Sequence, residues 1–149
     1  MLLKDEVEML RRIPLFAGVS PAKLKLLAFT SDRVSYKANQ SLFHQGDSAD
    51  AAYVILSGNA DILVDTPEGS IKVAEAKHDS IVGEIGILCD ISRTATVTAS
   101  TALEALRISK EHFLKLLTDY PEITIEIMRV LASRLSHTTA ELTQERSRR

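Results

Sequence analysis

The chain has 149 residues, 45% of them hydrophobic, and this length suits one compact domain with its own core. Its 18 Lys and Arg stand against 20 Asp and Glu, and this balance excludes a general attraction to nucleic acid or to anionic lipid. A single cysteine, Cys89, excludes an internal disulfide framework and a multi-cysteine zinc site, and it indicates a reducing, cytoplasmic compartment.

The distribution of apolar and aromatic residues excludes two further classes. Charged residues interrupt the longest apolar stretches within a few positions, so we expect no membrane segment. Only 5% of the residues are aromatic and Trp is absent, so stacking platforms for single-stranded nucleic acid would be hard to build. We therefore expect no nucleic-acid partner.

The first 30 residues show helical periodicity. Apolar residues recur at helical spacing from Lys4 to Ala28, with an interruption at IPLF (13–16). A second helix is expected to begin at Ser20-Pro21, because serine is a favoured N-cap and proline a favoured first helical residue. Residues 1–30 are thus predicted to form N-terminal helices.

Residues 31–108 show a different pattern. Short runs rich in Val, Ile, Leu and Thr alternate with turn signals such as Gly46-Asp47. About eight strands at this even spacing predict an antiparallel β jelly roll. The runs 52–56 and 60–64 flank a Ser-Gly-Asn turn, and we interpret them as a hairpin.

Residues 109–149 return to helical spacing. Ser109 is expected to cap one helix, and Tyr120-Pro121 to end it and open another. The apolar residues of the last helix fall four apart on one face: Ile123, Ile127, Leu131 and Leu135. We expect the first two turns of that face to pack against the barrel. The predicted fold is of α+β class, a single domain over 1–149 with a jelly roll between N-terminal helices and two C-terminal helices.

The most unusual local feature lies between residues 81 and 97. Gly83 and Gly86 follow a predicted strand and would let backbone amides approach a ligand. Arg93 comes soon after, and its guanidinium can hold a phosphate through two parallel hydrogen bonds. Glu84 would repel a phosphate but suits a ribose hydroxyl. The pattern indicates a site for a sugar phosphate or, alternatively, a strand connection in which Glu84 and Arg93 pair.

The same residues resemble a known family. GEIGIL at 83–88, followed by SRTATV at 92–97, is similar to the phosphate-binding cassette of cyclic nucleotide-binding domains. These domains occur in regulatory subunits of cyclic-AMP-dependent kinase, in cyclic-nucleotide-gated channels and in the bacterial catabolite gene activator. The similarity extends to IPLF at 13–16, FHQGD at 43–47 and YVILSG at 53–58, and so covers nearly the whole chain.

The resemblance implies a jelly-roll pocket for a cyclic nucleotide, with a short helix in the cassette. The implied site comprises Gly83, Glu84, Ile85, Gly86, Arg93, Thr94 and Ala95. Arg93 would pair with the cyclic phosphate, Glu84 would accept a hydrogen bond from the ribose 2′-hydroxyl, and the amides around Gly86 would complete the phosphate cradle. The chain is accordingly predicted to be a regulatory sensor whose C-terminal helices move on binding, with no cofactor besides this ligand.

Base recognition is less strongly specified by the resemblance. The family often has proline before the arginine, and Ser92 stands there, which removes no ligand contact. Thr94 follows the arginine, and a threonine there is often found where cyclic GMP is preferred, so cyclic GMP stays open as a ligand. Of the two nucleotides we favour cyclic AMP. In the family the last helix covers the base, which makes Leu135, His137 and Thr138 candidates for a lid.

Metal and catalytic chemistry fit the sequence less well. No two of the four histidines lie within five residues of each other, so we expect no metal site and set aside a jelly-roll metalloenzyme. Cys89 follows an apolar run and is expected to be a small buried residue rather than a nucleophile. No Gly-x-Ser-x-Gly motif is present, so we expect no enzyme.

One alternative concerns the role of the fold itself. A degenerate member of the family would keep the fold only as a protein docking module without ligand. In either case the sequence holds no helix-turn-helix, kinase or channel segment, so an effector or partner protein is expected outside this chain. The last helix leaves two alternatives open, a homodimer and a monomer.

Overall fold

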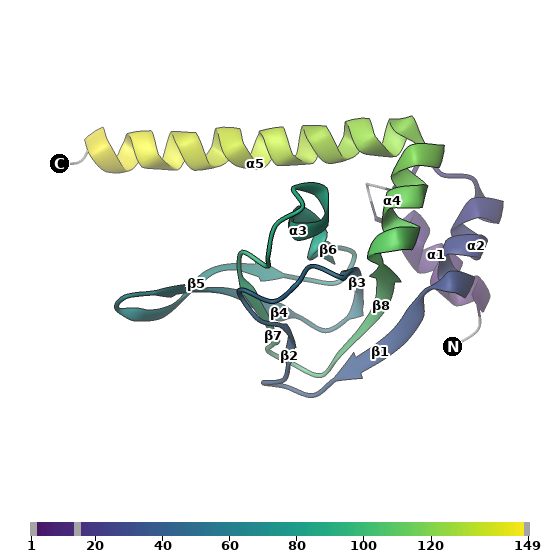
Figure 1. Ribbon diagram of the computed structural model, residues 1–149, viewed down its shortest axis with the longest axis horizontal. Coiled ribbons are helices and arrows are strands. Elements are labelled where there is room, and N and C mark those ends of the chain that lie inside the picture. Colours follow the sequence, from purple (N-terminus) through teal and green to yellow (C-terminus); the bar gives the residue numbers. More distant parts are fainter. Residues whose placement is uncertain (1–2, 14–15, 148–149) are drawn as a thin grey trace.

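The computed structural model describes residues 3–13 and 16–147, which form eight strands with helices at both ends of the chain (Figure 1). The strands are β1 (Asp32–Tyr36), β2 (Ser41–Phe43), β3 (Ala51–Ser57), β4 (Ala60–Thr66), β5 (Gly69–Ala76), β6 (Ile81–Val82), β7 (Thr96–Ala99) and β8 (Leu103–Ser109). The helices are α1 (Leu3–Arg11), α2 (Pro21–Thr30), α3 (Glu84–Leu88), α4 (Lys110–Asp119) and α5 (Pro121–Ser147). The C-terminal end of α5 lies on the opposite side of the molecule from α1 and α2 (Figure 1).

The strands form two four-stranded antiparallel sheets. Their orders are β1-β8-β3-β6 and β2-β7-β4-β5. The prediction of an α+β fold with an antiparallel jelly roll is therefore confirmed. Pro14 and Leu15, which belong to the IPLF run, lie outside the described residues.

The predicted hairpin between 52–56 and 60–64 is wrong. β3 and β4 flank the expected turn, but they belong to different sheets. β3 already pairs with β8 on one side and β6 on the other, so it has no free edge for β4. Gly58 lies at φ +86°, and a Cβ there would come within 2.2 Å of the carbonyl oxygen of Ala102. The turn packs against the connection between β7 and β8, where the chain crosses from one sheet to the other.

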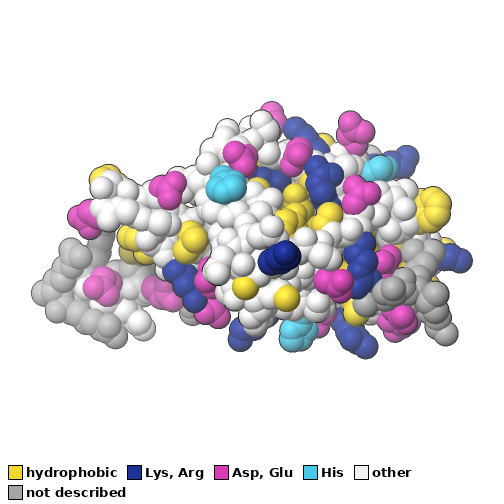
Figure 2. Space-filling model, turned by 90° about the horizontal axis from the view of Figure 1, so that it is seen from below, with side chains coloured by type: hydrophobic (Ala, Val, Ile, Leu, Met, Phe, Trp, Pro, Cys, Tyr) yellow, Lys and Arg dark blue, Asp and Glu magenta, His cyan; other side chains and the backbone are white. Residues whose placement is uncertain are grey.

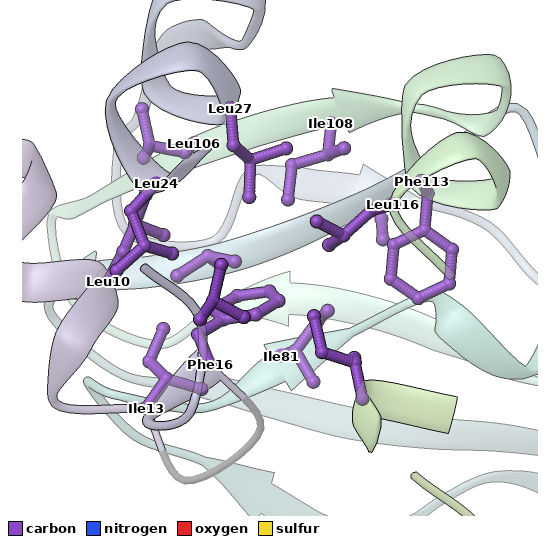
Figure 3. Close-up of a cluster of buried hydrophobic side chains, with 14 of the residues drawn as sticks. Leu10, Ile13, Phe16, Leu24, Leu27, Ile81, Leu106, Ile108, Phe113 and Leu116 are labelled. Atoms are coloured by element: carbon purple, nitrogen blue, oxygen red, sulfur yellow. The ribbon is translucent and has the colours of Figure 1, made fainter. Parts of the chain in front are cut away.

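Two hydrophobic clusters lie on opposite faces of β3, which is why this strand is buried almost throughout. One cluster, the helix-side cluster, joins the first sheet to the helices. It includes the side chains of Ala52, Val54 and Leu56 from β3. The other lies between the sheets and takes from β3 Ala51, Tyr53 and Ile55. Figure 3 shows Phe16, Leu24, Ile108 and Phe113 in the first cluster. Because alternate side chains of β3 point to opposite faces, this one strand packs against both the helices and the second sheet.

The expected helix starts are confirmed. Ser20 stands at the N-cap of α2 with Pro21 in the first turn, although the Ser20 side chain makes no capping hydrogen bond. At α4, the Ser109 hydroxyl accepts a hydrogen bond from the backbone N–H of His112 over 3.3 Å. Helix α5 begins at Pro121, directly after Tyr120 has ended α4.

Among the α5 side chains that the structure describes, the fully packed ones lie near the start of the helix. Ile123 and Ile127 are 1% and 5% exposed, so the prediction for the first two turns is confirmed. Leu131 is half-buried at the margin of the helix-side cluster, and Leu135 is 69% exposed. The helix continues past the cluster on which its first turns rest.

The face of the molecule seen from below carries charges of both signs (Figure 2). Figure 2 shows a face on which Lys and Arg are interspersed with Asp and Glu. Within residues 3–13 and 16–147, no helix is both long and apolar enough to cross a membrane.

Two leucines of α2, Leu24 and Leu26, test the packing of this helix on the helix-side cluster. Leu24 is fully buried and Leu26 is 54% exposed, so the same change to alanine removes a packed side chain in one case only. We expect Leu24→Ala to lower the free energy of unfolding by about 2–5 kcal/mol, and Leu26→Ala to change it by less than about 1 kcal/mol. Urea unfolding measures both. Equal losses would show that α2 does not pack as described.

Candidate functional site

A cavity of about 480 Å³ is lined by all seven residues of the predicted cassette site: Gly83, Glu84, Ile85, Gly86, Arg93, Thr94 and Ala95. Apolar residues from the strands form much of the rest of its wall, among them Phe43, Ile62, Ala74, Ala76 and Val97. Glu75, Lys77 and Ser80 also line it and add polar groups. The cavity therefore combines a polar end built from the cassette with apolar sheet residues. The roles of the individual residues stay a prediction.

The two cassette glycines stand where a side chain would collide with the site. Gly83, between β6 and α3, lies at φ +87°, and a Cβ there would be 2.7 Å from Nη1 of Arg93 and 3.1 Å from the carbonyl oxygen of Ala51. At Gly86, a Cβ would be 2.6 Å from the Cβ of Ala49. Helix α3 can thus approach the segment before β3 only because both positions lack a side chain.

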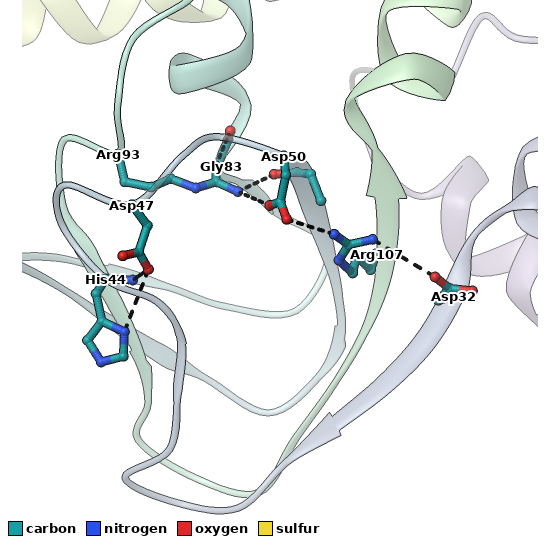
Figure 4. A network of polar contacts seen from close by, with 8 residues as sticks. Asp32, His44, Asp47, Asp50, Gly83, Arg93 and Arg107 are labelled. Atoms are coloured by element: carbon teal, nitrogen blue, oxygen red, sulfur yellow. Dashed lines mark hydrogen bonds and ion pairs between the residues drawn. The ribbon is translucent and has the colours of Figure 1, made fainter.

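The guanidinium of Arg93 points inward and is held by backbone carbonyls. Its Nη1 donates to the oxygen of Gly83 over 2.7 Å, and its Nη2 donates to the oxygen of Ala51 over 2.6 Å (Figure 4). The side chain is only 2% exposed. The cassette arginine thereby joins the turn before α3 to the first residue of β3.

The backbone of Arg93 is fixed as firmly as its side chain. Its N–H donates to the carbonyl of Asp47 over 2.8 Å, and its own carbonyl accepts from the N–H of Gly46 over 2.9 Å. Next to it, the N–H of Gln45 donates to the hydroxyl of Thr96 over 2.9 Å. The segment between β2 and β3 therefore holds the arginine at the cavity.

Charges around Arg93 form a chain that leads to β8. The nearest carboxylate, Asp50, lies 3.5 Å from Nη2 of Arg93 and 3.0 Å from Nη2 of Arg107 (Figure 4). Arg107 also lies 4.0 Å from Asp32 of β1. Asp50 is 65% exposed and is shared by two cations, so it neutralises Arg93 only in part.

Burial sets the electrostatic state of the site. It lowers the pKa of the Arg93 guanidinium below its usual value, because the charged form loses hydration. Among the described residues, no acceptor lies within hydrogen-bond distance of its Nε. Glu84, the first residue of α3, is also buried, with 5% exposure. The cavity end therefore holds a desolvated cation with an unused donor.

Of the three predicted lid residues, the structure describes the side chain of Leu135 alone. Leu135 is exposed and is not part of the cavity wall, and the side chains of His137 and Thr138 lie outside the described part of the chain. The lid stays a prediction.

Two contacts of Arg93 were missed by reasoning from the sequence. Phe43 lies under the guanidinium, with its ring centroid 4.0 Å from Cζ, although only its place in the FHQGD run was noted. Asp50 gave a weak signal as the acidic residue directly before a buried strand.

The other candidates for chemistry lie apart from the cavity. The expectation that Cys89 is buried is wrong, because Cys89 follows the end of the short helix α3 and is exposed. Within the described ranges, no three His, Cys, Asp or Glu side chains come together as a group that could hold a metal ion.

Comparison with known proteins identifies the family. The family model for the cyclic nucleotide-binding domain matches residues 33–120. An uncharacterised NTE family protein of Mycobacterium tuberculosis is 33% identical over 93% of this chain, and a CRP-like cAMP-activated global transcriptional regulator of the same organism is 29% identical over 91%. The chain spans 23% and 61%, respectively, of the lengths of these relatives.

Solved structures show the same fold. The sensor domain of the transcriptional regulator DNR from Pseudomonas aeruginosa superposes with a TM-score of 0.82 at 26% identity, over 93% of this chain and 94% of that one. The chain belongs to the cyclic nucleotide-binding domain family, which confirms the resemblance of its cassette.

Two glycines with similar backbone angles test the packing at Gly83. Gly46 lies at φ +91° with no atom within 4 Å of an added Cβ, whereas the same atom on Gly83 would meet Arg93 and Ala51. We expect Gly46→Ala to cost about 1 kcal/mol of stability from backbone strain, and Gly83→Ala to cost about 1–3 kcal/mol more from steric overlap. Urea unfolding gives both values. A Gly83→Ala protein as stable as Gly46→Ala would contradict the described contact.

Proposed function

We propose that this chain binds a 3′,5′-cyclic nucleotide in the cavity beside Arg93 and transmits binding to its C-terminal helices. The observation that carries the proposal is the buried guanidinium on the cavity wall, whose Nε has no acceptor in the described structure. A buried donor without an acceptor is costly, and a buried cation with an incomplete counter-charge favours an anion. A singly charged cyclic phosphate would supply both.

The remaining wall fits the other parts of a nucleotide. We propose that Glu84, beside the phosphate end, accepts from the ribose 2′-hydroxyl, and that amides of the first turn of α3 complete the phosphate contacts. The base would lie against the apolar residues Ile62 and Val97. A flat base without charge suits such a surface.

We propose cyclic AMP as the ligand, with cyclic GMP as the alternative. The similarity to the cAMP-activated transcriptional regulator of Mycobacterium tuberculosis supports adenine as the base. Thr94 lines the cavity and carries a hydroxyl that suits guanine, so it keeps cyclic GMP open.

The ion-pair chain offers a route to the helices. Asp50 is shared between Arg93 at the cavity and Arg107 on β8, and β8 runs directly into α4. A phosphate bound to Arg93 would weaken the ion pair between Arg93 and Asp50, and Asp50 would then pair more strongly with Arg107. We propose that this change shifts the position of α4 and α5, because a ligand moves an equilibrium through contacts that differ between its two states.

A docking module without ligand is the second candidate function. Exposed apolar residues on α5, including Met128, Leu135 and Leu142, favour some protein contact at this helix. The homodimer, the effector outside this chain, the absence of catalytic activity and the cytoplasmic location stay predictions.

Substitution of Arg93 separates the sensor from the docking module. Arg93→Ala removes the charge partner of the phosphate, so we expect it to cost about 3 kcal/mol, or at least about a hundredfold in Kd for cyclic AMP. Arg33→Ala removes a partly buried arginine that pairs with Glu104, and should leave the Kd within about threefold. Calorimetric titration of folded protein measures both. If Arg93→Ala binds as the unaltered chain does, the proposed site is wrong.

Spin-label distances test the coupling to α5. Labels at Lys37→Cys and Ala140→Cys, in a Cys89→Ser background, report how far α5 lies from the exposed segment after β1. We expect saturating cyclic AMP to shift this distance, and Arg107→Gln to reduce the shift by about half or more because Asp50 loses its partner on β8. Arg33→Gln is the control. An unchanged shift in Arg107→Gln would contradict the route.

A further inference from the structure

The counter-charge of Arg93 is unusually weak for so buried a cation. Its side chain is 2% exposed, and its two short hydrogen bonds go to neutral backbone oxygens, those of Gly83 and Ala51. Asp50 lies 3.5 Å away, is largely exposed and contacts Arg107 more closely. Another group must therefore contribute to holding this guanidinium inside the protein.

The face of the Phe43 ring supplies such a contact. Cζ of Arg93 lies 4.0 Å from the ring centroid, well within the range of a cation–π interaction. The ring is itself held by Tyr53 of β3, with centroids 5.8 Å apart and an angle of 35° between the planes. A Cβ on Gly83 would come within 3.3 Å of Cε2 of Phe43, so the ring edge also fills the space beside this glycine.

We propose that Phe43 is a positioning residue of the anion site, which holds the guanidinium of Arg93 in place through its ring face and substitutes for a dedicated carboxylate partner. The inference rests on the proposed function, because it gives Phe43 a role in the capture of the cyclic phosphate. It assigns that role to the negative ring face, not to the size of the side chain alone.

The choice of a ring over a carboxylate has a consequence for binding. A buried carboxylate would neutralise Arg93 and then compete with the phosphate for it. The ring stabilises the cation with its quadrupole and carries no net charge, so the site stays positive. Since the ring also fixes the plane of the guanidinium, less side-chain freedom is lost when the phosphate binds. Phe43 thus combines burial of the arginine with retention of its affinity for an anion.

Fluorinated phenylalanines at position 43 test the role of the ring face. Stepwise fluorination weakens the negative face of the ring with little change in its shape, and Phe113, which is buried in the helix-side cluster, is the matched control. We expect affinity for cyclic AMP to fall stepwise, by about tenfold or more for the fully fluorinated ring at position 43, and by less than about twofold for the same change at Phe113. Unfolding curves confirm that each protein is folded. Equal affinity across the series at position 43 would overturn the proposal.

A second measurement works without ligand. A proton held over a ring face is shifted upfield in the NMR spectrum, so the side-chain protons of Arg93 should resonate upfield in the unaltered chain and return downfield by a few tenths of a ppm or more in Phe43→Leu. If the unaltered chain binds no cyclic nucleotide, the proposed function is wrong. The Arg93 resonances still test the contact between Arg93 and the Phe43 ring, because they are measured without ligand. Resonances that do not respond to Phe43→Leu would contradict it.

Discussion

The buried guanidinium of Arg93 is the constraint on which the site depends. Three segments far apart in the chain meet at this group: the turn before α3, the start of β3 and the end of β2. Each contributes what a buried cation needs, since two supply carbonyl oxygens and the third an aromatic face. The glycine at position 83 follows from the same constraint, because a side chain there would overlap the guanidinium.

The jelly roll brings these segments together and connects them to the helices. β3 is packed on both faces. The carbonyl of its first residue, Ala51, accepts a hydrogen bond from Arg93, and alternate side chains of the strand reach the helix-side cluster. β8 pairs with β3 along most of its length and continues into α4. Arg93 thus contacts β3, β3 pairs with β8, and β8 leads into α4. A movement of the Arg93 side chain can reach α4 through these two strands.

Much of the fold could be predicted from the sequence because it depends on local patterns. The helix starts at Ser20 and Ser109, the strand spacing and the cassette glycines all show in short stretches of sequence. The pairing of β3 was not predictable in this way, because the turn at Gly58 has the same residues whether the chain forms a hairpin or crosses between sheets. Phe43 and Asp50 were missed for the same reason, since their contacts with Arg93 span 50 and 43 positions of sequence.

The most direct test of the account is calorimetric titration of folded, nucleotide-free protein with cyclic AMP and cyclic GMP, with 5′-AMP as the control. The two adenine nucleotides share the base and the ribose but differ in the charge and shape of the phosphate that Arg93 would meet. The account predicts tight one-to-one binding of a cyclic nucleotide, cyclic AMP first, and much weaker binding of 5′-AMP. No binding of either cyclic nucleotide would contradict it and leave the cavity without the role proposed for it.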